Sequence, residues 1–113
     1  MWHHLLVGGR NRKLARHVSD HLRSWLPQPY QVVDALEAIP KALRGQHPRN
    51  PVNRPLHQGV QIELPPTIRW NRERRGWSDH EGTPRTDDLH RLIDGLTAAV
   101  HAWRPAAPGE PTA

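Results

Sequence analysis

The chain has 113 residues, of which sixteen are Lys or Arg, eleven are Asp or Glu, and none is Cys. This length supports one small domain at most, and the lack of Cys excludes a disulfide framework and a thiolate metal site. No apolar run approaches the ~18 residues of a membrane span, and the N-terminus lacks a signal-peptide core. We therefore expect a cytoplasmic product with no membrane-spanning segment.

The first part of the chain predicts a strand, a helix and a second strand. Met1–Val7 has the pattern of a strand, and Gly8-Gly9 follows it as a turn. Because no complete phosphate-binding motif is present, tight-turn geometry rather than anion binding is favoured for these glycines. A helix is predicted over 11–25 from a single apolar stripe, made up of Leu14, Val18, Leu22, Trp25 and Leu26. Tyr30–Leu36 is the second strand, and a connection of this length implies a parallel pair.

A third strand is predicted over Gly59–Leu64, before Pro65-Pro66. Its apolar residues alternate with Gln61 and Glu63, the period-two pattern of a half-buried strand. The two polar side chains therefore share one face of the strand, so that an amide lies beside a carboxylate on a rigid element. Two interpretations remain open, because such side chains either face water or take part in chemistry.

The last third of the chain predicts a C-terminal helix. Thr83 with Pro84, or else Thr86, is a suitable cap, and Asp87 and Asp88 favour the positive end of the helix. The apolar stripe consists of Leu89, Leu92, Ile93, Leu96, Val100 and Trp103. We expect this helix to lie across the sheet, with a close contact at Gly95. The elements together predict an α/β fold of about three strands.

Two segments of the C-terminal third have a different composition. Residues 70–82 are charged and irregular, and the tail from 105 to 113 is rich in Pro and Ala, so we expect the domain to span 1–104 and the tail to be disordered. A basic cluster interleaves with aromatic residues, namely Arg69, Trp70, Arg72, Arg74, Arg75 and Trp77. Such a cluster binds nucleic acid, attracts an acidic polymer, or is simply a solvated loop.

His17 and His21 lie four residues apart on the predicted first helix. The segment is similar to the His-x-x-Glu-His of inverse zincins, but Asp20 replaces the Glu and the pair borders the apolar stripe. Solvated histidines on the flank of the helix are therefore favoured over metal ligands.

Two motifs, in the same order, resemble the late part of the poly-γ-glutamate hydrolase family. Val7–Asn11 matches a Gly-Gly-x-Asn that follows a strand. Asn50–Arg54, then Gly59–Pro65 and Arg69, match an Asn-x-x-Asn-Arg loop followed by Gly-Val-Gln-Leu-Glu-Leu and an Arg. The resemblance extends over roughly residues 5–70 and implies a phage- or bacteria-borne zinc peptidase. It also implies that the sheet is part of a carboxypeptidase-like fold, flanked by helices.

The resemblance also implies roles for individual residues. Glu63 matches the catalytic carboxylate of the family, and Gln61 either holds substrate or orients Glu63. Asn53 and Arg54 resemble the Asn-Arg pair by which carboxypeptidase-like enzymes grip substrate carboxylates, and Arg69 is a further partner for an acidic polymer such as poly-γ-glutamate. For Asn53 and Arg54 the alternative is hydrogen bonding that stabilises the loop.

The zinc that the resemblance implies has no matching ligands in the sequence. The family's His-Gly-Gly-x-x-Glu is absent, His3 and His4 lie too close to Gly8, and His57 alone cannot build a tetrahedral site. We therefore expect the C-terminal part of such a hydrolase, truncated, with no metal ligands and inactive on its own. The alternatives are a non-enzymatic binding module for acidic polymers and a small nucleic-acid-binding protein.

Overall fold

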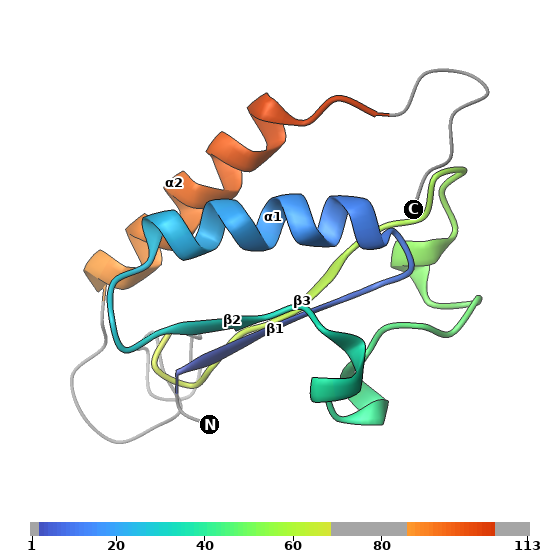
Figure 1. Ribbon diagram of the computed structural model, residues 1–113, viewed down its shortest axis with the longest axis horizontal. Helices are drawn as coiled ribbons and strands as arrows, with labels where there is room; N and C mark the ends of the chain where they lie inside the picture. Colours follow the sequence, from blue (N-terminus) through green and yellow to red (C-terminus); the bar gives the residue numbers. More distant parts are fainter. Residues whose placement is uncertain (1–2, 69–85, 106–113) are drawn as a thin grey trace.

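The computed structural model describes residues 3–68 and 86–105. Its strands are β1 (His4–Gly8), β2 (Gln31–Val33) and β3 (Gln61–Glu63), and its helices are α1 (Arg12–Trp25) and α2 (Thr86–Ala102). Three short 3-10 turns lie between β2 and β3, at Leu36–Ala38, Lys41–Leu43 and Pro51–Asn53. Figure 1 shows both helices on one side of the sheet. The α/β fold with about three strands and a C-terminal helix is confirmed.

The sheet has the strand order β2-β1-β3, so β1 lies in the centre. β1 and β2 are parallel, with Leu5 opposite Val32, and the predicted parallel pair is therefore confirmed. β3 joins the other edge of β1 in the antiparallel direction, with Val7 opposite Ile62. The strands are shorter than predicted, because the chain leaves β2 at Asp34 and turns into the first 3-10 helix.

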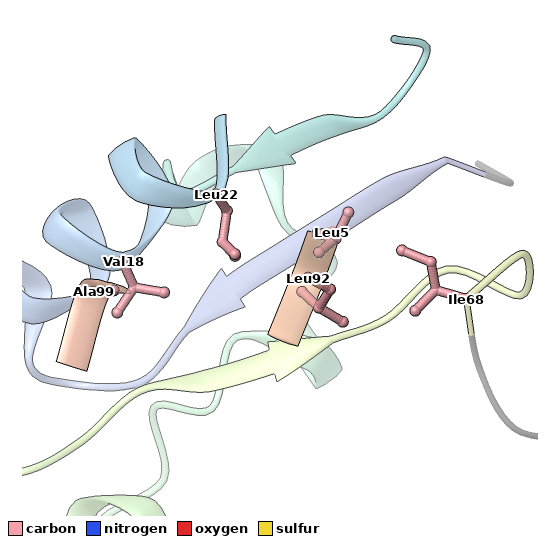
Figure 2. Close-up of a cluster of buried hydrophobic side chains, with 6 residues drawn as sticks. All are labelled: Leu5, Val18, Leu22, Ile68, Leu92 and Ala99. Atoms are coloured by element: carbon pink, nitrogen blue, oxygen red, sulfur yellow. The ribbon is translucent and has the colours of Figure 1, made fainter. Parts of the chain in front are cut away.

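The main apolar core lies between the sheet and the two helices (Figure 2). It contains six buried side chains, contributed by β1, α1, α2 and the segment after β3: Leu5, Val18, Leu22, Ile68, Leu92 and Ala99. Burying one of the larger aliphatic side chains contributes about 1.5–3 kcal/mol to the stability of the fold. This core fixes the face of the sheet that is closed to solvent, and so determines which side chains remain on the other face.

The face that α2 buries differs from the predicted stripe. Ile93 is 49% exposed and Val100 is 71% exposed. The helix packs mainly against α1, and its buried Leu92 belongs to the core cluster that contains Leu5. The small residue Gly95 allows this close approach, because a Cβ added there would lie 3.0 Å from the Cβ of Trp25. The predicted contact at Gly95 is confirmed, but the stripe is wrong at its two most exposed positions.

Several predicted features lie outside the described residues. These are the irregular segment 70–82, the Arg and Trp cluster that begins at Arg69, and nearly all of the predicted tail, 106–113. Of the two helices in the described part of the chain, neither is long and apolar enough to span a membrane.

Candidate functional site

Glu63 and Gln61 lie on the face of the sheet that the helices leave uncovered. Ile62 between them packs against the core, and the antiparallel register places Glu63 opposite Leu6 and Gln61 opposite Gly8. Since directly opposed residues share a face of the sheet, both polar side chains point away from the core cluster. Both are half-buried, so the carboxylate is neither enclosed nor fully in bulk solvent.

A line of amide hydrogen bonds leads to the Glu63 carboxylate. Asn50 Nδ2 donates to Gln61 Oε1 at 2.8 Å, and Gln61 Nε2 lies 3.5 Å from Glu63 Oε1, at the outer limit of a hydrogen bond. Asn50 is itself held, because its Oδ1 accepts from the backbone N–H of Val52 at 3.1 Å. The Gln61 amide is thus oriented with its oxygen toward Asn50 and its N–H groups toward the carboxylate. Of the two roles expected for Gln61, this geometry suits orientation of Glu63.

Asn53 anchors the motif loop, Asn50–Arg54, and is buried, with only 6% of its surface exposed. Its Nδ2 donates to the carbonyl oxygens of Gly45 at 2.7 Å and His47 at 3.0 Å. Its Oδ1 accepts from the backbone N–H of Arg10 at 3.0 Å. Both amide N–H groups and the amide oxygen are therefore engaged within the chain, the loop-stabilising arrangement expected as the alternative to a substrate contact.

Arg54, the next residue, has the opposite environment. It is exposed, and within residues 3–68 and 86–105 no hydrogen bond or ion pair of its guanidinium is found. It therefore remains available to an acidic ligand. Arg69, the other expected cationic partner, lies outside the described residues.

The two sequence motifs contact each other in space. Asn11 Nδ2 donates to the carbonyl of His57 at 3.0 Å, and the Asn11 N–H donates to the carbonyl of Gly59 at 3.1 Å. Gly9 has a φ of +94°, and a Cβ there would lie 2.3 Å from the Gly59 oxygen. Tight-turn geometry and close packing therefore explain the glycine, as predicted. The order of the motifs in the sequence corresponds to one continuous structure.

Arg12 fastens the same end of the sheet. Its guanidinium donates to the carbonyl of Gly9 at 2.9 Å and to the carbonyl of Asp34, which joins the chain after β1 to the chain after β2. Burial lowers the pKa of Arg12 below its ordinary value, while the nearby Asp34 carboxylate opposes this shift. Its hydrogen bonds to backbone carbonyls identify Arg12 as a structural residue of the framework.

A cavity of about 500 Å³ opens beside Gln61. Its walls come from the second 3-10 turn, the segment that follows this turn, and β3, with lining residues Lys41, Ala42, Gly45, Gln46, His47, Asn50 and Gln61. Lys41, Gln46 and His47 were not expected at a site from the sequence, because this segment has no periodic pattern. The one feature of the sequence that could have indicated these walls is the loop motif, because Asn50 and Asn53 form hydrogen bonds with lining residues.

His17, the first histidine of the pair on α1, lies at the interface between the helices. His17 is half-buried, its Nε2 lies 2.8 Å from the carbonyl of Ala99, and its ring centroid is 5.1 Å from that of Trp103. The prediction of solvated flank histidines is wrong for His17, because α2 packs over that side of α1.

The described residues do not fit a zinc centre. Across 3–68 and 86–105, no three His, Cys, Asp or Glu side chains are grouped so that they could hold a metal ion. A structural zinc site takes four such ligands and a catalytic site takes three.

The fold and the site together define an α/β protein in which an oriented carboxylate lies near a cavity with a lysine in its lining. A sequence model of the family described as Poly-gamma-glutamate hydrolase matches residues 1–93. The chain therefore belongs to the poly-γ-glutamate hydrolase family. Searches of curated proteins and of solved structures returned no match.

Proposed function

We propose that this chain carries the acid/base and substrate-binding part of an enzyme that hydrolyses γ-glutamyl amide bonds. The observation that carries the proposal is the line of hydrogen bonds from Asn50 in the loop through Gln61 to Glu63, the last two of which lie on β3. Membership of the family supports the substrate class, an acidic polymer with a free carboxylate on each residue.

In this proposal Glu63 is the general base and then the general acid. Its carboxylate takes a proton from the attacking water and later delivers that proton to the leaving amine. Gln61 is a positioning residue, because its amide nitrogen faces the carboxylate oxygen. A strand holds such a group more rigidly than a loop does, and this rigidity favours proton transfer in a fixed geometry.

The substrate is gripped by arginine in the same proposal. The exposed guanidinium of Arg54 supplies paired N–H donors that suit a carboxylate, and Arg69 is assigned the same role from its place in the motif. Asn53 supports Arg54 indirectly, since its hydrogen bonds fix the loop on which Arg54 lies.

We propose further that the enzyme depends on zinc and that its ligands come from protein outside the described residues. The described donor set does not fit the metal, and the role proposed for Glu63 is limited to carrying the proton. Elemental analysis of the purified chain, and of a chain extended by the coding region upstream of Met1, tests this. Zinc bound only by the extended chain is the expected result, and stoichiometric zinc in the shorter chain contradicts it.

Replacement of Glu63 tests the catalytic assignment. In the zinc-loaded extended chain, Glu63→Gln should lower the rate of amine release from poly-γ-glutamate by about a hundredfold or more, the usual contribution of a general acid/base. Glu37→Gln is the matched control, because Glu37 is an exposed glutamate in the first 3-10 turn, and it should keep the wild-type rate. A Glu63→Gln variant that hydrolyses as fast as the wild type would refute the assignment.

A further inference from the structure

We propose that the cavity beside Gln61 binds the α-carboxylate of a γ-linked glutamate residue, with Lys41 as its cationic partner. The inference rests on the proposed function, since it adds a subsite for the same substrate. The cavity holds about 500 Å³, which is ample for a carboxylate and the methylene groups next to it. One of its lining residues is Gln61, whose amide nitrogen also lies 3.5 Å from the carboxylate of Glu63.

The walls of the cavity are ordered before any ligand arrives. Asn53 binds the carbonyls of Gly45 and His47 on one wall. Gln46 Nε2 donates to the carbonyl of Gly9 at 2.6 Å, and Asn50 is bonded to Gln61. Their amides are thus committed to one another and to the backbone. Such a fixed frame lowers the cost of ordering the site when a ligand binds.

Two of the lining side chains, those of Lys41 and His47, offer donors to a ligand. Lys41 is the only Lys or Arg among the residues that line the cavity, and no Asp or Glu lines it. Within the described residues its ammonium has no ion pair. His47 Nδ1 accepts from the backbone N–H of Arg49 at 3.0 Å, so the proton of the neutral ring lies on Nε2, which is a second donor. A cavity with a cation and a free ring N–H selects an anion.

The position of the cavity indicates which anion. Gln61 joins the cavity to Glu63, so a ligand there lies next to the bond on which Glu63 acts. In poly-γ-glutamate the residues on either side of each amide bond carry free α-carboxylates. One of these carboxylates is the group that Lys41 meets while Glu63 faces the amide. Lys41 would then set the register of the polymer along the site.

Titration of the 113-residue chain with a γ-linked glutamate trimer tests the subsite, using NMR chemical shifts to measure affinity. Lys41→Gln should weaken binding about three- to fivefold, the effect of losing one solvent-accessible charge pair, whereas Lys41→Arg should retain it. Lys13→Gln is the matched control, because Lys13 is an exposed lysine on α1 that does not line this cavity. It should bind the trimer as the wild type does.

A second probe separates a specific contact from general charge. The trimer with its α-carboxylates converted to carboxamides should bind the wild type more weakly, and Lys41→Gln should discriminate less between the two trimers than the wild type does. Such non-additive losses identify groups in contact. Additive losses, no binding of the trimer by the wild-type chain, or equal affinity for a short DNA oligonucleotide would each overturn the inference.

The same series keeps the subsite distinct from the catalytic proposal. Glu63→Gln should leave the coupling between Lys41 and the α-carboxylates intact, because the coupling is a difference between the two trimers and a change in affinity common to both cancels. If Glu63→Gln proves fully active in the hydrolysis assay while Lys41 still couples to the carboxylate, the catalytic role falls and the subsite stands. If Glu63→Gln is inactive and no coupling is found, the catalytic role stands and the subsite falls.

Discussion

Asn53 and Arg54 are neighbours in the motif loop with opposite physical environments. The amide of Asn53 is buried and bonds three backbone groups, while the guanidinium of Arg54 lies in solvent. A single sequence motif thus combines a residue that builds the loop with one that is free to meet a ligand. The distinction decides how each should respond to mutation.

Asn53→Ala should lower the free energy of unfolding by about 2–3 kcal/mol, because it leaves the carbonyls of Gly45 and His47 without donors. Arg54→Ala is the matched control and should change stability by no more than about 0.5 kcal/mol, as exposed substitutions usually do. Urea denaturation of the two variants measures both. Equal stability of the two variants would show that the hydrogen bonds of Asn53 contribute nothing net.

At the residue scale, the sequence predicted the placement of some of these side chains and not of others. The alternation around Ile62 was sufficient to place Gln61 and Glu63 on one face, because strand geometry alone requires it. The burial of Asn53 was not predictable in the same way. It depends on the carbonyls of Gly45 and His47 turning toward the loop, a tertiary contact that leaves no periodic mark in the sequence.

At the scale of elements, the contact between α1 and α2 depends on a residue without a side chain. A Cβ at Gly95 would lie 3.0 Å from the Cβ of Trp25 and 3.2 Å from Cδ2 of Leu22. Leu22 is fully buried in the core, so it has little room to move. The helices can therefore approach closely only while position 95 remains small.

Gly95→Val should lower the free energy of unfolding by about 1–3 kcal/mol, the usual cost of overpacking a core. Asp94→Val places the same β-branched side chain at the adjacent, exposed position of α2, and so reports the effect of such a residue on this helix without the contact with α1. Thermal and urea unfolding of both variants gives the difference. If the two variants lose the same stability, steric contact with Trp25 and Leu22 is not the cause.

The elements themselves were largely predictable, and their packing was not. Apolar periodicity located α1 and α2, and the length of the connection indicated the parallel pairing of β1 and β2. The predicted apolar stripe of α2 was wrong at Ile93 and Val100, because the prediction assumed that large apolar residues are buried. The actual contact runs through Gly95 and Ala99, where small size permits close approach.

At the scale of the whole molecule, the chain carries a formal charge of +5 at pH 7. A net positive field attracts a polymer with a carboxylate on each residue before any specific contact forms. This attraction is long-range, and added salt screens it over a Debye length of about 10 Å at 0.1 M ionic strength.

The affinity of the chain for poly-γ-glutamate should therefore fall about tenfold or more between roughly 50 mM and 0.5 M NaCl. The polymer with its carboxylates converted to carboxamides is the control, and its binding should respond little to salt. Isothermal titration at several salt concentrations measures both. Salt-independent binding of the acidic polymer would contradict a role for the net charge.

Asn11 has a consequence for the way in which the molecule opens. Its Oδ1 caps α1 at Leu14, while its Nδ2 and backbone N–H hold His57 and Gly59. We therefore expect fraying of the first helical turn and release of the segment before β3 to occur together. Amide protons in these two segments, far apart in the chain, should exchange with solvent at linked rates.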